Sequence, residues 1–420
     1  MAADDQAVEL LLRFARSAHE AGGYPANELE PRIVELARAL GLSSVQASAT
    51  PTSVELTVGS IPHQHVYSLR VQPHPVDLHA IDRLDAIVAA VAAGRLDCRG
   101  ALEEIDELGR HPLRRPDWLL ALTSGVVAAA LAPILGGGWR ESVGAAMVGL
   151  AVGVLTRVVL RSERARTLAT PLGAFLASFL ACLLAVEGFD IAVTNVTLAA
   201  LVAFLPGMSM AIGMRELATH HLQAGLANSA NALVQLVGLA FGVGVGRSMA
   251  TSWLGTIPVN IPDPFPHGVD IAAAAVVGLA FVVTLRAPAR DAIWTCSAAV
   301  LAIVANLVAT RFLGGIAGVF VAALVVGLAG NVVARRLHRS PLPFIVPGSL
   351  MLVPGGIGYQ SAASLLADQT LTGIDTAFDA IVILLAIAYG LVASTVLMPD
   401  RPAASPGREG SWSGQPVEAP

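Results

Sequence analysis

The residues best suited to chemistry are polar side chains that interrupt long apolar segments beside two Pro-Gly pairs. Amides and hydroxyls at such places can bind both the ammonium and the carboxylate of a small zwitterion without burying an unpaired charge. The candidate substrate-pathway residues at the first pair are Pro206, Gly207, Ser209, Arg215, Asn228, Asn231 and Gln235. Those at the second pair are Pro354, Gly355, Tyr359, Gln360 and Ser361. A single Asn or Ser in an apolar helix is also explained by a hydrogen bond between helices.

Asp379 is the candidate for proton exchange. It lies about one turn into the last apolar segment, Phe378–Met398, and a carboxylate buried there can have its pKa raised into a useful range. An aspartate near a helix N-terminus also interacts favourably with the helix dipole, which is the structural alternative. Glu187 and Asp190 lie in a short external turn between segments, where solvation is favoured over the alternative of a proton relay.

The two Pro-Gly pairs belong to an internal repeat. Pro354 follows Pro206 by 148 residues, and the same spacing relates three further matched pairs: Gly207 with Gly355, Leu217 with Leu365, and Gly225 with Gly373. Pro-Gly interruptions at corresponding places in two halves of a membrane protein indicate a transport site. The alternative is a pair of ordinary helix kinks, since Pro and Gly are common in membrane helices.

The elements that must position these residues are membrane spans. The chain is 55% hydrophobic and only 14% charged, with a mean hydropathy of +0.67, whereas soluble domains carry about 25% charged residues. Charge is dense before Asp117 and sparse from Trp118 to Met398. This division predicts a head domain over residues 1–117, a membrane body over 118–398 and a Pro/Gly/Ser-rich disordered tail over 399–420.

The head has the pattern of a compact α+β domain. Helical spacing of apolar residues covers 5–21, 27–40, 77–93 and 97–108. Alternating β-branched stretches at Val45–Ala49, Ser53–Val58 and Val66–Val71 predict a small antiparallel sheet. No nucleophile–base arrangement stands out in the head. Its histidines match no zinc spacing and are interpreted as solvated.

The membrane body is predicted to be an α-helical polytopic structure of about ten transmembrane helices. The proline-rich stretch 248–268 separates two five-helix repeats, 118–247 and 269–398. Arginines follow alternate segments, so the positive-inside rule places both termini in the cytoplasm of an inner-membrane protein. Because five is odd, the second repeat enters the membrane from the opposite side. The two repeats are therefore expected to be inverted.

Other classes of function lack support in the residues. The net charge of −5 gives no sign of nucleic-acid binding, and three scattered cysteines form neither a disulfide framework nor a metal site. There is no Walker A motif and no TVGYG-like filter. The acidic N-terminus is unlike a signal peptide. We therefore predict no cofactor, no metal and no enzymatic activity, with protons, lipid and a small polar substrate as partners. A homo-oligomer is compatible with the sequence.

The chain resembles the threonine/serine exporter family. In the head, the resemblance rests on the segments 21–25, 35–41, 49–52 and 83–87 running on to 94–97. In the membrane body, it rests on Leu205-Pro-Gly207 with Arg215-Glu-Leu217, and on 344–348 with 353–355. The head carries Gly22-Gly23-Tyr24-Pro25 where a Gly-Ala-Pro-Thr-like turn is expected, which is a departure from the family pattern.

The resemblance implies a secondary transporter that exports threonine and serine, driven by the proton gradient. Relatives divided over two chains are associated with dicarboxylate export, so a succinate-like substrate is the first alternative. That substrate favours a more cationic lining, yet Arg215 is the only basic residue beside either Pro-Gly pair. The second alternative is a membrane-anchored hydrolase with the head as its catalytic domain.

Overall fold

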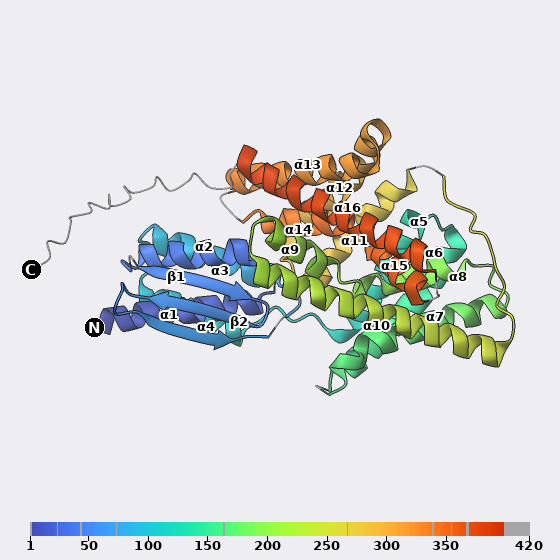
Figure 1. Cartoon of the computed structure of the whole chain (residues 1–420), viewed down its shortest axis with the longest axis horizontal. Helices are drawn as coiled ribbons and strands as arrows, with labels where there is room; N and C mark the ends of the chain where they lie inside the picture. The colour runs from blue at the N-terminus through green and yellow to red at the C-terminus, as the bar shows by residue number, and fades with distance from the viewer. Residues whose placement is uncertain are drawn as a thin grey trace, which may run out of the picture.

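The computed structural model describes residues 2–398 apart from 23, 43, 73, 163, 267, 338–339, 354 and 367–368. The predicted tail, 399–420, and Pro354 therefore lie outside the described residues. Two parts follow one another along the long axis of the molecule (Figure 1). The first, blue in Figure 1, contains strands and amphipathic helices, and the second consists of apolar helices of varied length.

The first part, called the head, holds four helices around a small sheet. The helices are α1 (Ala2–Glu20), α2 (Ala26–Ala39), α3 (Leu78–Ala92) and α4 (Cys98–Arg110). The strands β1 (Val45–Thr50), β2 (Ser53–Val58) and β3 (His65–Arg70) pair antiparallel in that order. Each observed strand lies within one residue of the predicted stretch at either end.

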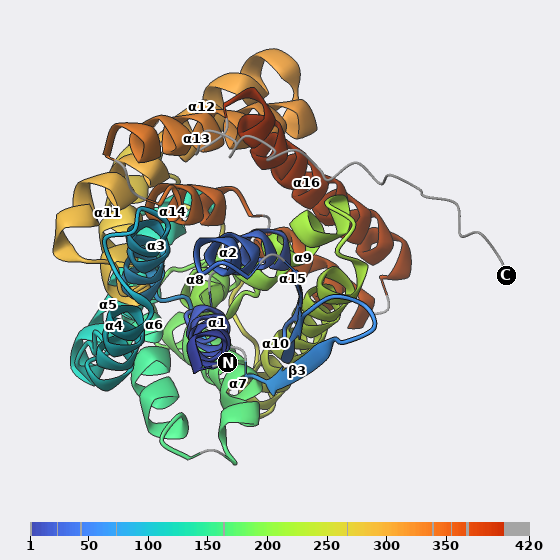
Figure 2. The same cartoon turned by 90° about the vertical axis from the view of Figure 1, so that its left-hand side faces the viewer.

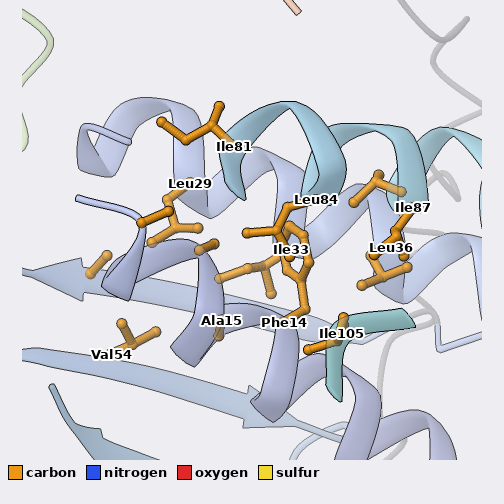
Figure 3. Packing of buried hydrophobic residues seen from close by; sticks show 14 of the residues in the cluster. Phe14, Ala15, Leu29, Ile33, Leu36, Val54, Ile81, Leu84, Ile87 and Ile105 are labelled. Carbon is orange, nitrogen blue, oxygen red and sulfur yellow. The ribbon is translucent and has the colours of Figure 1, made fainter. Parts of the chain in front are cut away.

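Apolar faces of the helices and of the sheet meet in the core of the head (Figure 3). Phe14 of α1, Ile33 of α2 and Leu84 of α3 have no exposed surface. The amphipathic spacing of each helix explains this, because residues three or four apart lie on one face. The same cluster extends beyond the head to Leu285 and Leu342 at the ends of membrane helices.

A buried polar cluster fixes the turn between α1 and α2. The Tyr24 hydroxyl donates to Asp85 Oδ1 at 2.7 Å, and Arg32 Nη1 lies 2.7 Å from the same oxygen. The Arg32 guanidinium also lies over the Tyr24 ring, 5.5 Å from its centroid. Burial, followed by the charge of Asp85, raises the pKa of the Tyr24 phenol well above its usual value. Tyr24 is therefore a hydrogen-bond donor throughout the physiological pH range.

Gly22→Ala is expected to destabilise the head more than Gly94→Ala. Both glycines have positive φ, +70° and +66°, where an alanine costs about 1–2 kcal/mol. Only at Gly22 would the added Cβ also meet an obstacle, lying 2.1 Å from the His74 carbonyl oxygen, whereas nothing lies within 4 Å at Gly94. Thermal unfolding of the two variants measures the difference. Equal melting temperatures would contradict the tight turn at Gly22.

The second part contains twelve helices in two runs of six among the described residues. The first run is α5 (Asp117–Ile134), α6 (Trp139–Val159), α7 (Ala169–Val186), α8 (Val193–Leu201), α9 (Gly207–Ala218) and α10 (Leu222–Leu254). The second is α11 (Val269–Thr284), α12 (Ala292–Leu313), α13 (Gly315–Leu337), α14 (Leu342–Leu352), α15 (Gly355–Leu366) and α16 (Thr370–Leu397).

Within the part of the chain that is described, eight helical stretches are long and apolar enough to cross a membrane. The number is nine if α8 and α9 are counted as one bent span. The remaining apolar helix, α11, has 16 residues, fewer than the roughly 20 that span a bilayer. The chain is thus a polytopic α-helical membrane protein, and ten spans stay a prediction.

The Pro-Gly pairs mark interruptions between short helices. A 62° bend separates the stretch Val193–Phe204 from α9, which begins at Gly207. A proline at this point has no N–H to continue the helical ladder, which explains the break. In the second run, α15 begins at the corresponding glycine, Gly355, after α14 has ended at Leu352. Helices α9 and α15 have the same length, 12 residues.

Candidate functional site

A cavity of about 300 Å³ lies where the head meets the first helix break. In Figure 2, seen from the head end, α2 lies in front of α9 and α15 near the centre of the helices. The head contributes these lining residues: His19, Gly22, Tyr24, Ala26, Leu29, Ala49, Thr50, Pro51, Thr52, His74, Pro75 and Val76. The membrane part contributes Met208, Ser209, Ile212, Glu216, Ala227, Asn228 and Asn231.

The carboxylate of Glu216 is the most buried charged group of this lining. Its residue is 2% exposed. The backbone N–H of Ala26 donates to Oε1 at 2.9 Å, and Asn228 Nδ2 donates to Oε2 at 2.7 Å. Ala26 is the first residue of α2, whose N-cap Pro25 makes no side-chain cap. The N-terminus of a helix favours an anion, so α9 supplies the carboxylate that α2 lacks.

Two further pairs join α2 to the region around α9. Glu28 Oε1 lies 2.6 Å from Arg215 Nη1, with both side chains largely buried. Glu30 accepts a hydrogen bond from the Ala49 N–H at 2.9 Å and lies 3.3 Å from His221 Nε2. Arg215 therefore points to the head and does not line the cavity, although its position in the sequence predicts a substrate-pathway residue.

The cavity lining is partly polar and, among the described residues, includes no strongly basic side chain. His19 donates through Nε2 to the Pro51 carbonyl at 3.0 Å, and burial lowers the pKa of this imidazole, so it is neutral at pH 7. Neither arginine nor lysine is among the described lining residues. Hydroxyl, amide and carboxylate groups thus provide the hydrogen-bonding capacity. Such a lining can accept an ammonium group and is unfavourable for a ligand with two negative charges.

The structure brings together only some of the predicted pathway residues. Ser209, Asn228 and Asn231 line the cavity, and Pro206 and Gly207 lie at the start of the helix that carries Ser209. Gln235, partly buried on α10, does not line it. In the second run, Gln360 is exposed, and the Ser361 hydroxyl donates to the Gly373 carbonyl at 2.7 Å. Tyr359 is buried within a cluster composed mainly of first-run residues.

The two helix breaks contact each other in a reciprocal way. A Cβ added at Gly207 would lie 3.3 Å from Val353 Cγ1, and one added at Gly355 would lie 3.0 Å from Leu205 Cδ1. Val353 follows Leu205 by the repeat spacing of 148, as Gly355 follows Gly207. Each break therefore places its glycine against the residue that precedes the proline in the other break. A twofold relation between the two breaks would produce reciprocal contacts of this kind.

Asp379 lies away from this arrangement. It is exposed on α16, which begins nine residues earlier at Thr370, and it does not line the cavity. The expectation of a buried carboxylate one turn into the span is therefore not what the structure shows. Hydropathy places a residue along a helix but does not give the face it occupies.

Sequence reasoning missed the part that the head plays in the cavity. Tyr24, His19 and the segment Thr50–Thr52 line it, although nothing in their spacing relates them to a helix more than 150 residues away. Glu216 belongs to the Arg215-Glu-Leu217 segment of the family resemblance, but the sequence did not identify it as the central carboxylate. The available signal was the pair Glu216 and Asn228. They are close enough in the sequence for two helices joined by a short loop to bring their side chains together.

Several apolar helices able to cross a membrane, together with a partly polar cavity beside a broken helix, are typical of helical membrane transporters. Comparison with known families is specific. Residues 9–250 match the family described as "Putative threonine/serine exporter", and residues 270–397 match "Threonine/Serine exporter, ThrE". The chain belongs to the threonine/serine exporter family. This confirms the predicted resemblance.

The curated relatives are distant in sequence. The "Threonine/serine exporter" of Corynebacterium glutamicum is 25% identical over 76% of this chain and 66% of its own length. The "Probable threonine/serine exporter" of Mycobacterium tuberculosis is 24% identical over 92% of this chain and 75% of its own. The "Probable succinate transporter subunit YjjP" of Escherichia coli is 25% identical over 56% of this chain and 89% of its own. No solved structure matches the chain.

Proposed function

We propose that this protein is a secondary active transporter that exports threonine and serine across the cytoplasmic membrane, driven by the proton gradient. The observation that carries the proposal is the cavity at the first break, where Glu216 lies beside Asn228 and Ser209. The relatives named as threonine/serine exporters support the same substrate class.

The lining suits a small hydroxy amino acid. Each oxygen of the Glu216 carboxylate already accepts one hydrogen bond and retains capacity for a second, which a substrate ammonium can use. Amide and hydroxyl donors such as Asn231 and Ser209 can bind the substrate carboxylate. A cavity of about 300 Å³ is of a size for one such molecule, at the lower end of small-molecule pockets.

We also propose that the two runs of helices form inverted repeats. The reciprocal contacts of Gly207 and Gly355 support a twofold relation, and so does the packing of α9 on α16 and of α10 on α15. The change of matched family between residues 250 and 270 supports a boundary in the predicted linker, 248–268. Alternating access then follows from movement of one repeat against the other.

The proposed orientation places the head and both termini in the cytoplasm. Arg215 and Arg286, on the side predicted to be internal, both form ion pairs with the head. The opposite end holds the link between α10 and α11 (Figure 1), where the Asn260 side chain donates to the Ile191 carbonyl at 3.4 Å.

Thiol labelling tests this orientation. In a protein without its native cysteines, a cysteine at Ser252 is expected to react with an impermeant maleimide in intact cells. One at Ser162 should react only after permeabilisation. Both positions are exposed in the structure. Labelling of Ser162→Cys from outside, with Ser252→Cys protected, would reverse the proposed topology.

For proton coupling, the structure favours Glu216 over Asp379. Glu216 is nearly inaccessible and contacts both the head and α10, so a change in its charge alters contacts in two elements at once. Coupling through Asp379 stays a prediction from the sequence, and it serves as the comparison in the experiments below.

The alternatives lead to different substrates. The similarity to a probable succinate transporter subunit favours a dicarboxylate, but the cavity has a buried carboxylate and lacks an arginine or lysine in its described lining. A hydrolase in the head would require a nucleophile activated by a neighbouring base. His19, half-buried in the head, makes its hydrogen bond with a backbone carbonyl.

Counterflow in proteoliposomes decides among these functions. We expect vesicles that contain the purified protein and unlabelled threonine or serine to accumulate labelled threonine from outside. Vesicles preloaded with succinate should not. Counterflow that occurs only with succinate would establish the dicarboxylate alternative. Absence of counterflow for all three, in vesicles with correctly folded protein, would contradict a transporter of either substrate class.

A further inference from the structure

The head binds to both runs of membrane helices at the same end of the molecule. The first contact site joins α2 to the first run, through Ala26 with Glu216 and Glu28 with Arg215. A second contact site joins α3 to the second run. It consists of two ion pairs: Asp77 with Arg286 at 3.2 Å, and Asp82 with Arg290 at 2.7 Å.

Backbone and apolar contacts reinforce the second site. The Leu78 N–H donates to the Leu285 carbonyl at 2.9 Å, and Arg115 Nη2 donates to the Ala287 carbonyl at 3.1 Å. Helix α3 also packs against α14, the short helix before the second break. The head therefore bridges the two runs and is not a separate domain on a flexible linker.

The head also closes one side of the cavity. Residues of α1, the α1–α2 turn, β1 and the segment before α3 form its wall opposite Ser209 and Asn228. From the head end, α1 and α2 lie in front of the central helices (Figure 2). A substrate entering from this end must pass between the head and α9.

The ion pairs of the second contact site differ from those that hold the head together. The side chains of Arg286 and Arg290 are 41% and 62% exposed. Water therefore competes with the aspartates for these arginines, and the ion pairs break and re-form readily. Inside the head, the Arg32–Asp85 pair is 9% and 4% exposed. Separation of α3 from the second run at this site is thus easier than disruption of the head itself.

We propose that the head is a gate at the cytoplasmic entrance of the pathway. While both contact sites are formed, the head holds the two runs in one relative position and covers the cavity. It must leave the second contact site before substrate passes and before the runs can move against each other. This inference rests on the proposed transport function and assigns its regulation to the contacts of α2 and α3.

A reversible tether between the head and the second run tests the gate. Cysteines replace Asp82 and Arg290, which lie outside the cavity lining, and Cys98, Cys182 and Cys296 are changed to alanine. A short bis-methanethiosulfonate reagent joins the pair through disulfides. We expect the tether to lower threonine efflux by about tenfold or more, because the competent state becomes rare, and a reductant to restore it.

A tether confined to the head provides the matched control. Ser48 and Glu55 are paired residues of β1 and β2, both exposed, and antiparallel partners have Cα atoms close enough for a disulfide. The Ser48→Cys, Glu55→Cys protein, treated with the same reagent, is expected to keep the efflux of its untreated form. Full efflux in the Asp82→Cys, Arg290→Cys protein after complete tethering would overturn the gate.

A second readout does not depend on transport. A cysteine at Ser209, in the cavity, is alkylated by an impermeant maleimide from the cytoplasmic side. We expect the tether to slow this reaction, and Asp82→Arg, which opposes Arg290 with a like charge, to accelerate it in the untethered protein. Unchanged rates in both would contradict the gate even if threonine proved not to be a substrate. Changed rates without threonine efflux would contradict the transport function alone.

Discussion

Replacing Gly207 or Gly355 with leucine is expected to lower threonine efflux per folded transporter by about tenfold or more. Each new side chain would enter the reciprocal contact between the breaks. A Cβ added at Gly207 would lie 3.3 Å from Val353 Cγ1, and one added at Gly355 would lie 3.0 Å from Leu205 Cδ1. Overpacking costs about 1–3 kcal/mol, enough to shift the balance between two conformations about tenfold. The measurement is labelled-threonine efflux from proteoliposomes, normalised to monodisperse protein.

Gly244→Leu is the matched control, because Gly244 lies on the membrane helix α10 and an added Cβ there meets nothing within 4 Å. The Gly244→Leu protein should retain full efflux and insert into the membrane as well as the unmodified protein does. Pro206→Ala should have a milder effect than Gly207→Leu, since it removes a kink without adding bulk. Full efflux in both leucine variants at the breaks would show that the repeat is architectural and that the pathway lies elsewhere.

Glu216→Gln is expected to lower gradient-driven efflux by about tenfold to a hundredfold and to remove its dependence on pH. The amide has the shape of the acid but only one acceptor oxygen, so its NH₂ group must face either the Ala26 N–H or the Asn228 NH₂, both of which donate to Glu216. Loss of a hydrogen bond to a charged group costs about 1.5–3 kcal/mol, which corresponds to about tenfold to a hundredfold in rate. Efflux across an imposed pH gradient measures the effect.

Asp379→Asn provides the comparison, because this carboxylate is exposed on α16 and away from the cavity. We expect it to retain both efflux and pH dependence, and Glu216→Asp to recover part of the activity. The reverse outcome, with coupling lost in Asp379→Asn and retained in Glu216→Gln, would return proton exchange to the residue that the sequence indicated.

Local features of this chain were predictable because local physics determines them. The helix interruption at Pro206 follows from a missing N–H, and the observed bend lies there. The strands of the head follow from alternation of β-branched residues, with Ser53–Val58 found at its predicted bounds. The apolar segments follow from hydropathy, although α11 is shorter than a full span.

The contacts that assemble the cavity were not predictable from local patterns. The bond between Ala26 and Glu216 joins residues 190 positions apart, and no periodicity in a single sequence relates them. The face that Asp379 presents depends on how α16 packs, which hydropathy does not encode. Arg215 was predicted as a substrate-pathway residue beside the break, whereas the structure pairs it with Glu28, in a domain that was treated separately.

Protection of the cavity by substrate tests the central claim most directly, namely that threonine binds between the head and the first break. The rate at which a maleimide alkylates Ser209→Cys is measured in purified protein with and without threonine, serine or succinate. We predict that threonine and serine slow the reaction in a saturable way and that succinate does not. An alkylation rate unaffected by threonine in a variant that still exports it would place the substrate site outside this cavity.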